Sequence, residues 1–361
     1  MKFDFVKFGE IPDLAQSHPL IFEKFGSDQG KLLSDNPYID DEFPYLFYMH
    51  EDNKLACYFY SFPDRMKCDD QIFPWAWNGD LFTDPDFRGQ GLATKLVSQQ
   101  VAVQHELGYG WGGVFSTEAA IRLYQKLNFS LPGYAERYLY LRSLTPLLRE
   151  HVKSRGLVAV ANGLYQAGRF VIEPVLKSTG SKITVTAMEV PTCHRDRHTS
   201  LPVTNHDTKF HFDHGVDMLR WKLRADKTNR LYLLKDQATD ENLCYIVLRS
   251  RNITKPIAGR YKNFEMMSLM DFGLFVDDDR PYDAIISATF NLFENSTAEL
   301  LDIVSSNQKL NLRARRRGMR SVGKGMSYKF SAPDSWNLPP ETMSASNWQL
   351  THFTGDAFGF E

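Results

Sequence analysis

DPDFRGQGLATKLV, residues 84–97, is the stretch that decides the fold. It follows an apolar run, Ala76 to Thr83, that is typical of a strand, and it leads into a segment whose apolar residues recur with helical spacing. Arg88, Gly89 and Gly91 lie at the turn between the two. Glycines let a backbone approach a ligand closely, and the first helical turn has unpartnered N–H groups at the positive end of the helix dipole. The stretch therefore predicts a strand, a glycine turn and a helix that together bind a phosphate.

The segments on either side predict strands and helices in one α/β or α+β layer. Apolar residues at Leu92, Leu96, Val103 and Leu107 give the helix one buried face, and Gly108 is expected to end it. Alternating or apolar runs predict the strands, and helical spacing predicts the helices. The expected strands are residues 3–8, 45–50, 55–62, 71–83, 111–116 and 137–141, and the further helices are residues 11–25 and a segment that Thr117 would cap.

The rest of the chain repeats this order. Residues 144–176 predict a connecting helical segment interrupted near Gly163 and Gly168, and the polar, histidine-rich residues 191–214 predict a loop. Further strands and helices follow, ending in a strand pair up to Phe330. At the place of the glycine turn stands DDDRPYDAI, residues 277–285, in which three acidic residues would repel a pyrophosphate. The second copy is therefore not expected to bind a phosphate in this way.

Length and composition bound the class of protein. A chain of 361 residues exceeds the usual size of a single core, so two domains are expected. A net charge of -2 gives no overall field that would attract nucleic acid or an anionic membrane. The N-terminus has no apolar signal core, and no window is long enough to span a bilayer. Four cysteines without paired spacing favour a reducing compartment, so we expect a cytoplasmic protein.

Two further clusters allow two interpretations each. A cysteine and five histidines could be metal ligands or part of a polar loop; their spacing fits no standard zinc pattern, so no metal is expected. A run of arginines could meet a phosphorylated substrate or form a solvated helix face. The first cluster is Cys193, His194, His198, His206, His211 and His214, and the second is Arg313, Arg315, Arg316, Arg317 and Arg320.

Two motifs carry a resemblance to a known family. Arg88, Gly91 and Ala93 match the R/Q-x-x-G-x-G/A signature of the GNAT acetyltransferase superfamily, and TEAAIRLYQKLNF, residues 117–129, resembles its second motif, N-x-x-A-x-x-L-Y-x-K-x-G-F. Thr117 departs from the asparagine of that motif. The chain resembles tandem GNAT-like proteins in which one half keeps the coenzyme site.

The resemblance implies two GNAT-like domains, each with a mixed, mostly antiparallel twisted sheet flanked by helices. The implied organisation is a coenzyme-binding domain at residues 1–142, a connecting helical segment at 143–180, and a degenerate domain with a C-terminal tail at 181–361. The tail from Ser331 loosely resembles the endings of two-domain proteins found with surface-polysaccharide biosynthesis.

The resemblance also implies a site and a reaction. Acetyl-CoA, the acyl donor, would lie between splayed strands at residues 76–83 and 111–116. Tyr124 would protonate the leaving thiolate, or would only pack on its helix face. Asp80 would be the general base, or a hydrogen-bonded strand residue. The implied coenzyme contacts are Leu81, Phe82 and Thr83 with the pantetheine, Arg88, Gly89, Gln90, Gly91, Leu92, Ala93 and Thr94 around the pyrophosphate, and Thr117.

The function expected from this resemblance is transfer of an acetyl group to a primary amine of a small molecule, such as an amino sugar or a nucleotide sugar. One alternative is a tandem transferase that takes aminoacyl-tRNA; the intact RGQGLA loop and the lack of positive charge argue against it. Another is a non-catalytic module that senses the coenzyme or acts as a scaffold. No feature of the sequence predicts an oligomeric state.

Overall fold

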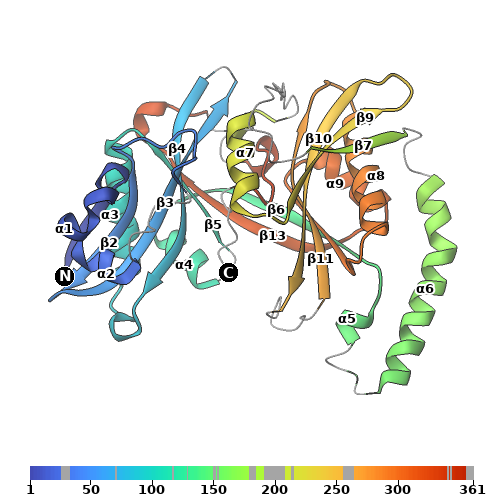
Figure 1. Cartoon of the computed structure of the whole chain (residues 1–361), viewed down its shortest axis with the longest axis horizontal. Helices are drawn as coiled ribbons and strands as arrows, with labels where there is room; N and C mark the ends of the chain where they lie inside the picture. The colour runs from blue at the N-terminus through green and yellow to red at the C-terminus, as the bar shows by residue number, and fades with distance from the viewer. Residues whose placement is uncertain are drawn as a thin grey trace.

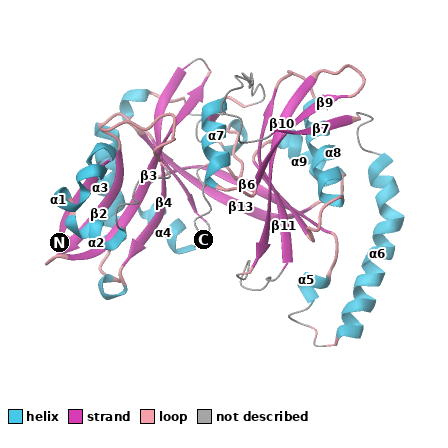
Figure 2. Cartoon of the chain, viewed as in Figure 1, coloured by secondary structure: helices cyan, strands magenta, loops and turns pink. Residues whose placement is uncertain are grey.

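The computed structural model describes most of the chain. Its described residues are 1–25, 33–69, 71–115, 118–127, 129–148, 152, 154–178, 184–190, 208–212, 215–254, 264–339, 341 and 344–354. Within these ranges the strands form one sheet, in the order β1-β2-β3-β4-β5-β13-β6-β12-β11-β10-β9-β7, and β8 pairs with β3 beside it. The sheet is mixed, mostly antiparallel and flanked by helices (Figure 2), as the sequence predicts.

The N-terminal half of the sheet has helices on both faces. Helices α1 and α2 pack on one face, where Leu14 and Ile21 enter the core around Trp75 and Trp77. Helix α3 packs on the other face through Leu92 and Leu96. The elements are β1 (Lys2–Lys7), η1 (Phe8–Asp13), α1 (Leu14–Ser17), α2 (Pro19–Phe25), β2 (Pro44–Glu51), β3 (Lys54–Cys68), β4 (Gln71–Thr83), η2 (Pro85–Phe87), α3 (Leu92–Glu106), β5 (Gly110–Phe115), α4 (Glu118–Lys126) and β6 (Ser130–Leu141).

The C-terminal half repeats this layout. Its parallel strand pair β11 and β12 is linked by α8, as β4 and β5 are linked by α3. The elements are α5 (Thr145–Leu148), α6 (Arg155–Ser178), β7 (Val185–Val190), β8 (Phe210–Phe212), α7 (Val216–Ala225), β9 (Asn229–Asp236), β10 (Asn242–Ile253), β11 (Phe264–Leu274), α8 (Arg280–Glu294), β12 (Leu300–Ser305), α9 (Gln308–Arg316), β13 (Arg320–Ser331), η3 (Asp334–Trp336) and η5 (Ala345–Asn347).

The two halves exchange a strand at the middle of the sheet. β13, the last strand of the chain, lies between β5 and β6, while β6 lies between β13 and β12. Arg137 on β6 donates two hydrogen bonds, of 2.9 and 2.8 Å, to the buried carboxylate of Asp302 on β12. Each half is therefore completed by a strand from the other half.

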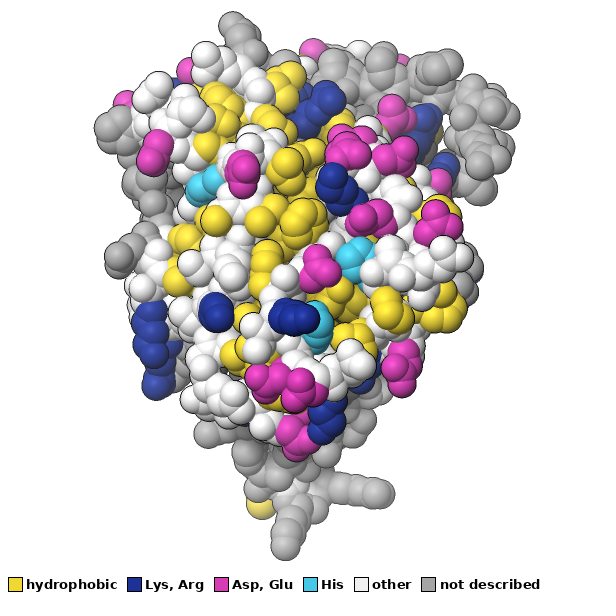
Figure 3. All heavy atoms as spheres, turned by 90° about the vertical axis from the view of Figure 1, so that its left-hand side faces the viewer, with side chains coloured by type: hydrophobic (Ala, Val, Ile, Leu, Met, Phe, Trp, Pro, Cys, Tyr) yellow, Lys and Arg dark blue, Asp and Glu magenta, His cyan; other side chains and the backbone are white. Residues whose placement is uncertain are grey.

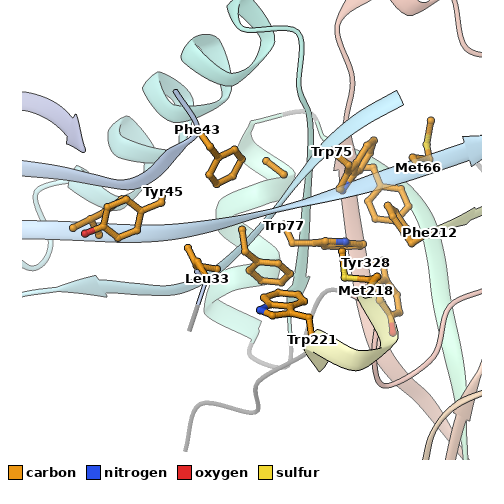
Figure 4. Close-up of a cluster of buried hydrophobic side chains, with 14 of the residues drawn as sticks. Leu33, Phe43, Tyr45, Met66, Trp75, Trp77, Phe212, Met218, Trp221 and Tyr328 are labelled. Carbon is orange, nitrogen blue, oxygen red and sulfur yellow. The ribbon is translucent and has the colours of Figure 1, made fainter. Parts of the chain in front are cut away.

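Side-chain contacts on one face of the sheet also join the halves. Figure 1 shows α7 between them, and Figure 4 shows Met218 and Trp221 of this helix against the aromatic side chains of the first half. The ring of Trp221 lies 5.9 Å from that of Phe62. Figure 3 shows the outer face of the first half, where apolar side chains gather in the middle and charged ones surround them. No helix in the described ranges is long and apolar enough to cross a membrane.

The structure corrects three expectations of secondary structure. Helix α6 runs through Gly163 and Gly168 without interruption, because glycine lowers helix stability without forcing a break. The expected loop at residues 191–214 includes a strand, β8, that pairs with β3. The expected final strand pair is the single strand β13, which curves with register shifts between its two neighbours.

Candidate active site

An opening forms where β4 and β5 separate. Their parallel register runs from Trp75↔Gly110 to Asn78↔Gly113 and goes no further, although β4 continues to Thr83. Beyond Asn78, β4 pairs with β3 on its other side. Among the described residues, the far edge of residues 79–83 has no strand beside it and can pair with an extended, amide-bearing ligand.

A buried polar network lies at the point of separation. Asn78 donates from Nδ2 to the carbonyl oxygen of Gly112 on β5, at 3.1 Å, and accepts from Ser61 Oγ at 2.6 Å. Gln100 and Gln104 of α3, both fully buried, donate to Ser61 Oγ at 2.9 Å. The network ties the helix that follows the glycine turn to the base of the opening. This network was not predicted; its signal in the sequence is the polar Asn78 within the apolar run of β4.

The glycine turn has the geometry expected of an anion site. Gly89 and Gly91 have φ values of +79° and +74°, which residues with a side chain rarely adopt. Across the described residues, no backbone hydrogen bond is donated by the N–H groups of residues 89–94, whereas Lys95 N donates to Gly91 O to begin the helix. Arg88 donates from Nε to Thr83 O at 3.2 Å, so it braces the turn. Gly89, Gln90 and Gly91 are exposed, and the N–H groups of this turn suit the phosphates of a coenzyme.

Tyr124 lies on α4, behind the opening. Its side chain is fully buried, and its ring lies 5.2 Å from that of Trp111 and 5.7 Å from that of Phe129. Burial raises the pKa of its hydroxyl, and the neighbouring Cys57 raises it further. Cys57 pairs with Thr83 at the end of β4, so Tyr124 packs near the free part of that strand. A phenol in this setting stays protonated at neutral pH and can donate a proton.

Asp80 lies in a β-bulge on β4. Tyr60 pairs with Gly79 and Tyr58 with Phe82, so β4 has one more residue than β3 between these pairs. Asp80 is exposed and has φ +60°, a conformation that costs a residue with a side chain roughly 1–2 kcal/mol. The bulge interrupts the regular alternation of side chains at Asp80, next to the point where β4 and β5 separate.

The equivalent opening in the second half is filled by the chain itself. β11 and β12 separate beyond the pair Leu269↔Ile303. The tail, residues 348–354, enters there: Phe353 N donates to Met270 O at 2.9 Å, and Gln349 Nε2 donates to Phe272 O at 2.7 Å. The tail is almost wholly buried. This contact was not predicted, because it joins segments about eighty residues apart and no local pattern encodes their pairing.

The acidic turn of the second half is neutralised internally. Asp279, at the N-terminus of α8, binds Lys309 at 3.0 Å and Arg313 at 2.9 Å, and Asp278 binds Arg280 at 2.8 Å. Bonding to these cations lowers the pKa of both carboxyl groups. The Asp278 carboxylate also accepts a hydrogen bond of 2.8 Å from Arg280 N in the first turn of α8, so a phosphate at this helix N-terminus would have to displace it. Both the charge and the filled opening exclude a second coenzyme site of the first kind.

The remaining candidates from the sequence are dispersed. Thr117 lies outside the described residues, as do all members of the cysteine–histidine cluster except His211, which is on β8. No group of three potential metal ligands is found in the described ranges. In the arginine run, Arg313 binds Asp279 and Asp283, and Arg315 binds Glu136, so both have carboxylate partners within the protein.

Comparison with known proteins identifies this architecture. Residues 44–131 match the Acetyltransferase (GNAT) domain profile, and no curated protein matches the chain. A GCN5-related N-acetyltransferase from Anabaena variabilis is 14% identical, with a TM-score of 0.52 over 92% of this chain and 73% of that one. A probable N-acyltransferase from Enterococcus faecalis is 10% identical, with a TM-score of 0.52 over 91% and 72%. Saccharomyces cerevisiae N-myristoyltransferase, solved with bound myristoyl-CoA, is 10% identical, with a TM-score of 0.51 over 96% and 83%. At these identities the likeness shows the fold.

Proposed function

We propose that the chain, whose residues 44–131 match the GNAT domain, is an acyl-CoA-dependent N-acyltransferase that moves an acetyl group to a primary amine. One observation carries the proposal: the first half has a strand edge without a neighbouring strand among the described residues, and it leads to the N–H groups of residues 89–94. The second half has the same topology, but its strand edge bonds to the tail and its acidic turn binds Lys309 and Arg313. The donor site is thus assigned to the first half.

The residues of the opening suit a direct transfer. The edge of residues 81–83 would pair with the pantetheine arm, and the glycine turn would hold the pyrophosphate. The amine nitrogen bonds to the acyl carbon and the carbon–sulfur bond breaks. Tyr124 supplies a proton to the thiolate, while the proton lost by nitrogen passes to Asp80 or to water. Because the amine attacks the thioester itself, holding both partners in place supplies much of the rate.

The second half would shape the acceptor site. Trp221 of α7 packs against Phe62 of β3, and Lys222 of the same helix donates to Phe353 O at 3.3 Å. Helix α7 thus links the acceptor side of the first half to the tail. An acceptor bound there, an amino sugar or another small amine, would contact both halves.

Calorimetry with acetyl-CoA tests the donor site. The intact chain is expected to bind it, and Gly91→Glu is expected to abolish binding because it adds bulk and negative charge at the turn. Gly163→Glu is the matched control: this glycine is exposed on α6, with no atom within 4 Å of an added Cβ. Absence of acetyl-CoA binding by the intact chain, with both variants folded by circular dichroism, would overturn the proposal.

A transfer assay tests the acyl group and the chemistry. Acetyl-CoA and myristoyl-CoA are each supplied with a panel of primary amines, and free thiol release is followed. Thiol release that depends on the amine and is faster with acetyl-CoA is the expected result. Faster transfer from myristoyl-CoA would support an N-acyltransferase but would overturn the proposal that the transferred group is acetyl.

A further inference from the structure

Three aromatic rings form a corner on the face of the first half that α1 and α2 cover. Phe25 at the end of α2 meets Tyr58 at 88° and 5.0 Å between centroids, and meets Tyr60 at 70° and 5.8 Å. Tyr58 and Tyr60 on β3 meet each other at 75° and 5.6 Å. The rings are therefore nearly perpendicular in pairs. Since a cation is attracted to a ring within about 6 Å of its centroid, one cation can be in reach of all three.

The corner is only partly covered, and its walls are supported from behind. Phe25, Tyr58 and Tyr60 are neither fully buried nor fully exposed. Phe82 of β4 stacks on Tyr58 at 5.2 Å, and Tyr45 lies 6.5 Å from Tyr60. The hydroxyl of Tyr45, a residue only 1% exposed, has no hydrogen-bond partner among the described residues. A buried hydroxyl of this kind calls for a polar partner.

A negative charge lies beside the corner, because Asp80 stands between Gly79 and Phe82, the partners of Tyr60 and Tyr58 on β4. Burial raises the pKa of Tyr60, and the charges of Tyr58, Tyr45 and Asp80 raise it further, so these groups lie within electrostatic reach of one another. The Asp80 carboxylate likewise adds to the raised pKa of Tyr58. Asp80 belongs to the bulge that borders the opening between β4 and β5. The corner is thus one strand away from the proposed donor, about 5 Å across the sheet.

The second half shows what an aspartate at this place does. Asp271 lies two residues beyond the last pair of β11 and β12, as Asp80 lies two residues beyond the last pair of β4 and β5. Asp271 accepts a hydrogen bond of 3.0 Å from Thr351 Oγ1 of the tail and one of 3.2 Å from Tyr245. An aspartate–tyrosine pair at the equivalent position thus holds a donor group that enters the opening. By this parallel, Asp80 with Tyr58 and Tyr60 is placed to bind a hydrogen-bond donor of a ligand.

We propose that Phe25, Tyr58, Tyr60 and Asp80 form the ammonium subsite of the acceptor, which takes a primary amine carried on a short alkyl chain. This inference rests on the proposed function and narrows it. Aromatic faces and one carboxylate suit an alkylammonium, whereas none of these residues, nor Tyr45 or Phe82, carries a positive charge that would bind a phosphate. A nucleotide-linked sugar would therefore have to place its phosphates elsewhere.

Binding of n-butylammonium chloride to the intact chain, without donor, tests the subsite. Tyrosine fluorescence or ligand-detected NMR follows the titration, and n-butanol serves as the uncharged probe of similar length. The ammonium is expected to bind at least about tenfold more tightly than the alcohol. Tyr60→Leu and Asp80→Asn should each weaken it about tenfold, whereas Tyr60→Phe should retain affinity within about threefold. Tyr232→Leu, which alters a half-buried tyrosine of the second half, is the matched control and should change nothing.

Equal binding of butylammonium and butanol would overturn the subsite, as would an equal loss in Tyr232→Leu. Acetyl-CoA binding, measured on the same samples, separates the two proposals. If the chain binds acetyl-CoA but does not prefer the ammonium to the alcohol, the proposed N-acyltransferase stands and the ammonium subsite is refuted. Ammonium selectivity without donor binding retains an amine site and refutes the transferase.

Discussion

Replacing Asn78 by leucine should destabilise the chain through stranded hydrogen-bond donors, because the two side chains are similar in size. Asn78 is 2% exposed and accepts from Ser61 Oγ at 2.6 Å and from Gln100 Nε2 at 2.5 Å. Leucine leaves both donors without this acceptor, at roughly 1–3 kcal/mol for each. It also removes the bond to Gly112 O, worth about 1 kcal/mol. The expected loss in the free energy of unfolding is about 3–7 kcal/mol, a large part of the 5–15 kcal/mol typical of a domain.

Urea unfolding followed by circular dichroism measures this loss. Asn252→Leu is the control, because Asn252 is exposed on β10 and such changes usually stay within about 0.5 kcal/mol. A chain with Asn78→Leu, Ser61→Ala, Gln100→Met and Gln104→Met removes the donors together with the acceptor. It should regain at least about half of the loss, since replacing all partners by apolar groups is far less costly than stranding some of them.

The reasoning fails if Asn78→Leu lowers the free energy of unfolding by less than about 1 kcal/mol. It also fails if the losses caused by the four single substitutions simply add up in the fourfold variant. The same samples report on the opening. Without the amide that bonds to Gly112 O, the two strands lose the contact that fixes where they separate. Acetyl-CoA affinity should therefore fall about tenfold or more, while Asn252→Leu leaves it unchanged.

Three further predictions concern charge, catalysis and assembly. Burial acts to raise the pKa of Asp302, but the charges and hydrogen bonds of Arg137 and His352 together hold that pKa below its ordinary value. The resulting stability is present above about pH 4 and is lost as the pH falls further, so Asp302→Asn should flatten the fall in urea stability between roughly pH 5 and 3. Tyr124→Phe should lower kcat about a hundredfold with acetyl-CoA affinity intact, and unchanged turnover would exclude its role as proton donor. A fragment of residues 1–142 should not give the dispersed NMR spectrum of a folded domain, because β5 and β6 would lack the strand between them; adding residues 143–361 should restore it.

The features that local sequence encodes were predicted well. β4 spans residues 71–83 as expected, and α3 ends near Gly108, whose φ of +81° explains the glycine. The turn at Gly89 and Gly91 was found because its chemistry is written in adjacent residues. Strand and helix signals of this kind depend on spacing within one segment, which a single sequence displays directly.

The features that depend on distant partners were not predicted. Nothing in the alternation of residues 320–331 shows that β13 inserts between β5 and β6, because a strand pattern marks a buried face and leaves the neighbour open. The role of Asn78 depends on Gln100 and Gln104, which approach it only once α3 packs on the sheet. Of the proposed ammonium subsite, the sequence singled out Asp80 alone, as a candidate base. Phe25 and Tyr60 were not predicted, because they come to Asp80 from other elements.

The second half provides an internal guide to what the first half binds. Its opening holds a stretch of the tail, whose Phe353 N–H donates to the strand at Met270 O. At the N-terminus of its helix α8, the N–H of Arg280 donates to the carboxylate of Asp278 at 2.8 Å. An amide-bearing chain in the gap and an anion at the helix are also the two features that distinguish acyl-CoA, whose pantetheine arm carries amides and whose pyrophosphate is anionic. The chain supplies both to one half from its own residues and leaves the other half to be completed by a ligand, which accounts for a single donor site in a sheet built twice.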